Sequence, residues 1–141
     1  MRRRVLFDLD RTLWPCTVEY HPRLKLPRST ALPVLRYFQS QGAPLSVVSQ
    51  SSEPAKCRSF VNTLFPGIRF QHVIVYPAED KNSHVRAIGP PYDFITFDDD
   101  EDVLKAYRAQ YPLCTTVHCD EPLAWKHVKL LHDLNIPLTK K

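Results

Sequence analysis

Four aspartates come in two pairs, and each pair directly follows a short apolar run. Asp8 and Asp10 come after one run, and Asp98 and Asp99 come after another. Clustered carboxylates are the hard oxygen ligands that Mg²⁺ takes, together with water and substrate phosphate. One carboxylate can attack phosphorus, and a second can protonate the leaving oxygen and then activate water. The pairs predict phosphoryl transfer with Asp8 as nucleophile and Asp10 as general acid and base, and all four are candidate metal ligands.

A serine and a lysine extend this set. Ser49 follows a third apolar stretch and can donate a hydrogen bond to a phosphoryl oxygen, and Lys81 can supply a fixed positive charge. Each residue also has an ordinary structural interpretation, Ser49 as a turn residue and Lys81 as an exposed ion pair with Glu79 or Asp80. The register of Ser49 with the other motifs favours phosphate binding, and for Lys81 the role in the site is likewise favoured over the exposed ion pair.

Other polar and aromatic residues nearby receive different interpretations. Acidic side chains suit the positive end of a helix dipole, so the residues at 100–102 are expected to be structural. His118 and Cys119 are adjacent, and neighbours in a strand face opposite sides, so they do not predict a metal pair. Trp14 and Tyr20 fit core packing and pocket lining equally well.

The elements that must position these residues alternate along the chain. Apolar runs predict strands at 5–7, 45–48, 70–76, 94–97 and 115–119. One helix is expected from a cap at Ser29 or Thr30 to Gln41, and a second one after a cap at Ser52. Further helices are expected over residues 82–88, after the acidic residues 98–100 up to 110, and over about 122–134. Residues 13–27 are expected to form a loop. This alternation predicts one α/β domain, residues 1–141, with helices on both faces of a parallel sheet. Ligands bind outside the carboxyl ends of such strands, and four separate segments bring the polar candidates to that edge.

Composition narrows the classes of function. The chain has 141 residues, 43% hydrophobic, with a net charge of +4 and no glycine-rich phosphate loop. Four cysteines without a CxxC pair predict reduced thiols and no zinc site. We expect an intracellular, cytoplasmic protein, because the sequence shows neither a signal peptide nor a membrane span. The basic runs at 2–4 and 140–141 fit either solvated termini or contact with nucleic acid, and solvated termini are favoured.

The motifs resemble those of the haloacid dehalogenase (HAD) superfamily. The segment 7–13, Phe-Asp-Leu-Asp-Arg-Thr-Leu, is similar to its first motif, and Ser49, Lys81 and Phe97-Asp98-Asp99 are similar to the other three. Within the superfamily, the segment 7–15 resembles the magnesium-dependent phosphatase 1 family, as do Ser49-Gln50-Ser51-Ser52-Glu53 and Tyr76-Pro77. The resemblance implies a Rossmann-like three-layer sandwich without a cap domain, and Mg²⁺ as the cofactor. It also implies that the Asp10 carbonyl and Asp99 bind the metal and that Asp98 orients Lys81.

Two departures from the family bear on the substrate. Gln50 stands where the family usually has arginine, so a cation near the substrate is lost, and the segment after Leu13 is shorter than usual. The family implies a phosphotyrosine protein or a phosphosugar as substrate, acted on by hydrolysis of a phosphate monoester. Two alternatives stay open: a phosphatase of nucleic-acid ends, suggested by the basic termini, and a non-catalytic binding protein that keeps the fold.

Overall fold

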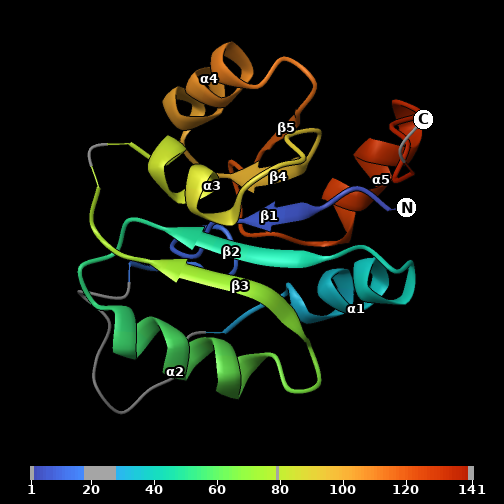
Figure 1. Ribbon diagram of the computed structural model, residues 1–141. Helices are drawn as coiled ribbons and strands as arrows, with labels where there is room; N and C mark the ends of the chain where they lie inside the picture. Colours follow the sequence, from blue (N-terminus) through green and yellow to red (C-terminus); the bar gives the residue numbers. More distant parts are fainter. Residues whose placement is uncertain (1, 18–27, 79, 140–141) are drawn as a thin grey trace.

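The computed structural model describes residues 2–17, 28–78 and 80–139 (Figure 1). Its strands are β1 (Val5–Phe7), β2 (Leu45–Ser49), β3 (Phe70–Val75), β4 (Ile95–Asp98) and β5 (Thr115–His118). Its helices are α1 (Leu32–Ser40), α2 (Pro54–Leu64), α3 (Asn82–Ile88), α4 (Glu101–Gln110) and α5 (Trp125–Asp133). The strands form one sheet in the order β3-β2-β1-β4-β5, and every adjacent pair is parallel. The predicted α/β class with a parallel sheet is therefore confirmed.

Two hydrophobic cores make the molecule a sandwich of three layers. Alternate residues of a strand face opposite sides of the sheet, so Phe7 joins the core under α1, α2 and α5, while Leu6 joins the core under α3 and α4. Phe7 stacks on Phe97 at 5.4 Å between ring centroids, and Phe38 of α1 packs against both rings. The central strand β1 is buried on both faces, which fixes the position of the residues that follow it.

Most of the predicted elements are found within three residues of their predicted bounds, but two helix caps were predicted wrongly. The N-cap of α1 is Ala31, because the hydroxyl of Thr30 donates to the carbonyl of Leu123 instead. The N-cap of α2 is Glu53 rather than Ser52, with Pro54 in the first turn as expected. Most of the loop predicted at 13–27, with Tyr20, lies outside the described residues. Among the helices described, none has the length and apolarity needed to cross a membrane.

Arg3 is a structural residue, so neither of the interpretations offered for the basic run applies to it. Its side chain is buried, at 7% exposure. Its guanidinium donates to the carbonyls of Asp93, Phe94, Leu113 and Pro137 and to the hydroxyl of Thr115, at distances from 2.6 to 3.4 Å. The next residue, Arg4, donates to the carbonyl of Gly89 at 2.7 Å. The arginines therefore join the start of β1 to the segments that precede β4 and β5.

We expect Arg3→Gln to lower the free energy of unfolding by about 3 kcal/mol, because one buried and several partly buried carbonyls lose a charged donor. The measurement is urea denaturation followed by circular dichroism. The control is Arg2→Gln, the same change one residue earlier, where the side chain makes an exposed hydrogen bond to Thr139. That variant should change stability by less than about 0.5 kcal/mol. Equal effects of the two substitutions would show that the Arg3 hydrogen bonds do not stabilise the fold.

Candidate active site

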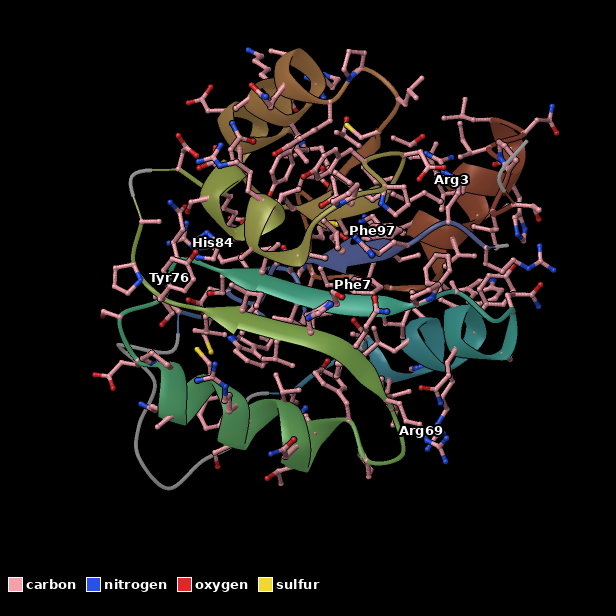
Figure 2. All side chains as sticks on the ribbon, viewed as in Figure 1. Arg3, Phe7, Arg69, Tyr76, His84 and Phe97 are labelled. Carbon is pink, nitrogen blue, oxygen red and sulfur yellow. The ribbon has the colours of Figure 1, made fainter. Side chains whose placement is uncertain are left out.

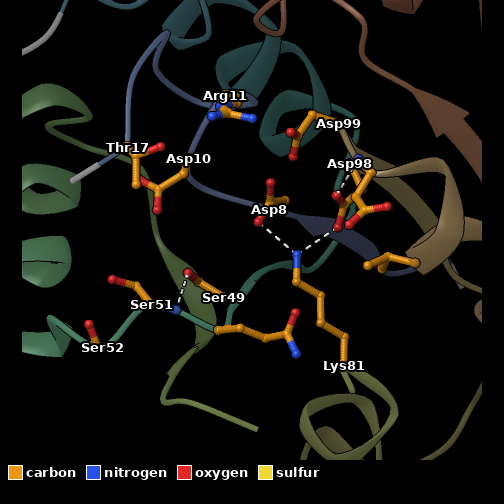
Figure 3. Close-up of a pocket in the computed structure, with 13 residues that line it drawn as sticks. Asp8, Asp10, Arg11, Thr17, Ser49, Ser51, Ser52, Lys81, Asp98 and Asp99 are labelled. Carbon is orange, nitrogen blue, oxygen red and sulfur yellow. Dashed lines mark hydrogen bonds and ion pairs between the residues drawn. The ribbon is translucent and has the colours of Figure 1, made fainter. Parts of the chain in front are cut away.

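The candidate residues meet beside the central strand, where the order of the sheet reverses. The chain runs from β1 outward to β3, returns across β1 through α3, and continues to β4 and β5. Ligands bind at such a switch point, outside the carboxyl ends of the strands. A pocket of about 560 Å³ lies there (Figure 3). It brings together every predicted site residue: Asp8, Asp10, Ser49, Lys81, Asp98 and Asp99.

Asp8 is held at both carboxylate oxygens. Its Oδ1 accepts from the ammonium of Lys81 at 2.7 Å, and its Oδ2 accepts from the hydroxyl of the fully buried Thr12 at 3.1 Å. Burial raises the pKa of Asp8 to about 6, although the charge of Lys81 acts in the opposite direction. The carboxylate is therefore fixed in one orientation and stays ionised at neutral pH, as a nucleophile must.

Lys81 links the first aspartate pair to the second. Its Nζ lies 2.7 Å from Asp8 and 2.6 Å from Asp98, and all three side chains are buried (Figure 3). Burial alone would lower the pKa of Lys81, but the charges of Asp8 and Asp98 raise it above its ordinary value. Burial, and after it the charge of Asp8, raises the pKa of Asp98 to about 6. Two carboxylates therefore share one ammonium, which leaves an excess of negative charge.

Three carboxylates converge on one point. Asp8, Asp98 and Asp99 each place an oxygen within 4.8 Å of the others, the one such group among the residues that the structure describes. Hard oxygen ligands around a net negative charge suit Mg²⁺, so these residues fit the predicted ion. The carboxylate of Asp10 is not in this group. The structure thus separates the four predicted ligands into a cluster of three and one residue beside it.

Asp10 is oriented by a residue whose role the sequence left open. The indole Nε1 of Trp14 donates to Oδ1 of Asp10 at 2.8 Å. Trp14 is fully buried and packs edge-on against Phe60 of α2, with ring centroids 5.5 Å apart. The turn that joins Asp10 to Trp14 is closed by the amide of Leu13, which donates to the carbonyl of Leu9. Trp14 therefore packs in the core and contacts a site residue, and its spacing of four residues from Asp10 is the signal that could have indicated this.

We expect Trp14→Phe to reduce kcat by about tenfold for substrates with poor leaving groups, because Asp10 loses the donor that orients it. Substrates with good leaving groups need little protonation and should be affected less. The measurement is kcat across a series of aryl phosphates of graded leaving-group acidity. The control is Phe60→Leu, which disturbs the same packing but leaves the hydrogen bond intact. A uniform loss across the series in Trp14→Phe would contradict a role through Asp10.

The end of β2 and the loop after it bring polar side chains to the pocket. The hydroxyl oxygen of Ser49 accepts from the amide of Ser51 at 3.2 Å, and that of Ser51 accepts from the amide of Glu53 at 3.1 Å. Gln50 also lines the pocket, and its Nε2 donates to the carbonyl of Ala78 at 2.8 Å. The Ser49 hydroxyl hydrogen can still point into the pocket, since only its oxygen lone pair is used in that contact.

The residues expected to be structural behave as such. Asp100 caps α4 by accepting from the amide of Asp102 at 2.9 Å, although it also lines the pocket. His118 is exposed, and its Nε2 lies 2.9 Å from the carbonyl of Asp99, whereas Cys119 is buried. Burial raises the pKa of the Cys119 thiol to about 12, which makes it a poor nucleophile.

Comparison with known proteins identifies the fold. No protein-family model matches this chain, and no curated protein matches it in sequence. One match is a crystal structure of the N-terminal part of protein BF1531 from Bacteroides fragilis, which contains a phosphatase domain and is complexed with Mg. The match has a TM-score of 0.69 and 16% sequence identity, and it covers 100% of this chain and 41% of that one. A protein assigned as a phosphoglycolate phosphatase from Lactobacillus delbrueckii subsp. bulgaricus matches with a TM-score of 0.46 and 20% identity, over 65% of this chain and 41% of that one. This chain thus spans about two fifths of the first structure, and it has the fold of that phosphatase-containing part.

Proposed function

We propose that this chain is a magnesium-dependent phosphatase of the HAD superfamily that hydrolyses phosphate monoesters. The observation that carries the proposal is the fixed Asp8 carboxylate, bonded to Thr12 and Lys81 within a cluster of three carboxylates at the sheet edge. The Mg complex of the Bacteroides fragilis structure supports it, because this chain has the same fold. Similarity of the segment 7–15 to the magnesium-dependent phosphatase 1 family supports it further.

The proposed reaction has two displacements at phosphorus. An oxygen of Asp8 attacks, the bond from phosphorus to the leaving oxygen breaks, and Asp10 donates a proton to that oxygen. Asp10 then removes a proton from water, which attacks the aspartyl-phosphate, releases inorganic phosphate and restores Asp8. Lys81 and the Ser49 hydroxyl bind phosphoryl oxygens, and Asp98 positions Lys81. Asp8, Asp99 and the Asp10 carbonyl would hold Mg²⁺, which reduces repulsion between the carboxylate and the phosphoryl group.

We expect hydrolysis of 4-nitrophenyl phosphate to disappear on chelation with EDTA and to return with Mg²⁺, since the cluster otherwise repels an anionic substrate. Mg²⁺ should also raise the melting temperature of the natural chain, because it binds only the folded carboxylate cluster. Asp99→Asn should weaken that stabilisation, and Asp102→Asn, an exposed acidic residue of α4, serves as its matched control. Undiminished turnover after exhaustive chelation would rule out a metal-dependent mechanism.

We infer a phosphoprotein or a phosphosugar as the substrate, in keeping with the family that the sequence resembles. The nucleic-acid alternative rested on the basic termini, and the side chains of Arg3 and Arg4 are now seen to bind backbone carbonyls of this chain. Phosphorylated oligonucleotide ends should therefore be poorer substrates than phosphotyrosine peptides. A non-catalytic binding protein would fail the EDTA test, because it would turn over nothing with or without Mg²⁺.

A further inference from the structure

Arg11 occupies an unusual backbone position inside the candidate active site. It lies between Asp10 and Thr12 with a φ of 63°, in the left-handed region. Glycine and asparagine adopt this region easily, whereas a long side chain with a Cβ atom is strained there. Such strain is concentrated at functional sites, where another contribution of the residue offsets it. The backbone of Arg11 therefore raises the question of what its side chain does.

The Arg11 guanidinium is available to a ligand. Among the residues that the structure describes, two cationic side chains line the pocket, those of Arg11 and Lys81. Lys81 is buried between Asp8 and Asp98, and its charge is matched by theirs. Arg11 is exposed, and within the described part of the chain it makes no ion pair or side-chain hydrogen bond. Of these two described cations, Arg11 is thus the one that a substrate meets unpaired.

The position of Arg11 indicates which part of the substrate it meets. In Figure 3, Arg11 and Lys81 lie on opposite sides of Asp8, and Arg11 is on the side of Asp10 and Asp99. Lys81 lies against the attacking carboxylate, where the phosphoryl group must be, whereas Asp10 must reach the leaving oxygen. Arg11 follows Asp10 directly and also lines a neighbouring pocket of about 310 Å³ with Pro122 and with the acidic residues Asp99 and Asp120. The leaving portion of the substrate can extend toward that pocket, where Arg11 is the positively charged side chain among the described lining residues.

We propose that Arg11 is a specificity-determining residue that binds a second anionic group, carried on the leaving portion of the phosphate monoester. The proposal rests on the proposed phosphatase function and names its substrate class: monoesters that bear a carboxylate or a second phosphate monoester beyond the scissile bond. A guanidinium suits this task, because its planar fork donates two parallel hydrogen bonds to either oxyanion. Such a contact would supply at position 11 a positive charge that Gln50, which lines the same pocket, does not carry.

The test compares three substrates with the same aromatic frame: 4-carboxyphenyl phosphate, 1,4-phenylene bisphosphate and 4-carbamoylphenyl phosphate, whose para substituent is uncharged. The natural chain should prefer the two anionic substrates in kcat/KM. Arg11→Asn keeps a residue that tolerates the left-handed backbone and removes the charge, so each preference over the carbamoyl compound should fall about tenfold. Arg11→Lys should retain part of the preference. The anionic substrate whose kcat/KM preference over the carbamoyl compound falls further in Arg11→Asn identifies carboxylate or phosphate as the favoured group.

The control variant is Arg69→Gln, which removes one exposed positive charge far from the pocket (Figure 2) and should leave both preferences unchanged. Unchanged preferences in Arg11→Asn, with activity intact, would overturn the inference and leave the proposed function standing. Calorimetric binding of 4-carboxybenzylphosphonate and its carbamoyl analogue, in the presence of Mg²⁺, provides a readout that needs no turnover. Equal affinity of the natural chain for the two phosphonates would likewise overturn it, whereas a chain that binds but hydrolyses nothing would overturn only the proposed function.

Discussion

Asp8→Asn is expected to abolish phosphatase activity, with a loss in kcat of at least about 10³-fold. An amide oxygen is a far weaker nucleophile than a carboxylate, so no aspartyl-phosphate can form. The substitution is nearly isosteric, and the amide can still accept a hydrogen bond from Lys81 or Thr12 through its oxygen. The fold should therefore survive, which circular dichroism and thermal unfolding would verify.

Two measurements make this expectation specific to the nucleophile. Incubation with ³²P-labelled substrate and acid quenching should trap a labelled enzyme in the natural chain and none in Asp8→Asn. Asp10→Asn is the matched control, since it should still accept phosphate from substrates with good leaving groups and then release it slowly. Wild-type turnover by Asp8→Asn would place the nucleophile elsewhere in the chain.

Lys81→Met is expected to lower the free energy of unfolding by about 3–5 kcal/mol at pH 8, because it leaves Asp8 and Asp98 buried without their counter-charge. The loss should shrink as the pH falls. Burial already raises the pKa of both carboxyl groups to about 6, above their value in the unfolded chain, and removal of the ammonium raises them further. The folded state of the variant therefore takes up protons already above about pH 6, where the folded natural chain and the unfolded state do not, and this uptake stabilises the variant.

The measurement is urea denaturation at pH 5 and pH 8 without divalent ions. Lys105→Met, the same change at an exposed position of α4, is the control and should have little effect at either pH. Mg²⁺ should restore part of the stability of Lys81→Met, because it replaces the missing positive charge, while phosphatase activity stays low. A destabilisation equal at the two pH values would mean that lost packing, rather than unpaired charge, is its cause.

The sequence was most informative where local pattern and chemistry agree. The position of Asp8 and Asp10 in the pocket could be predicted, because an apolar run marks a strand and the carboxyl ends of parallel strands meet at one edge of the sheet. The helix α3 was predicted with its observed bounds, since Gly89 with its positive φ ends it. Lys81 was predicted by its place after β3, and the structure brings it to Asp8 and Asp98.

The failures share a physical cause, which is a tertiary partner that local pattern does not reveal. Thr30 is a good helix cap by type, but a carbonyl 93 residues away takes its hydroxyl. Arg3 belongs to a basic run that looks solvated, but it binds carbonyls of three distant segments just before the amino end of β1. The positions of the Trp14 and Arg11 side chains depend on the turn after β1. That turn contains a residue in the left-handed region, and the residue is Arg11, a type that does not predict this backbone conformation.

The position of β1 in the sheet has a consequence for how the chain is made. Its partners are β2, which begins at residue 45, and β4, which begins at residue 95. On the ribosome, β1, β2 and β3 can pair long before β4 emerges, and the most apolar strand then lies at an open edge. Such an edge is a template for pairing with another chain. The interval between the emergence of β2 and the emergence of β4 is thus the one in which a nascent chain most needs a chaperone, and slow translation in that interval should lower the soluble yield.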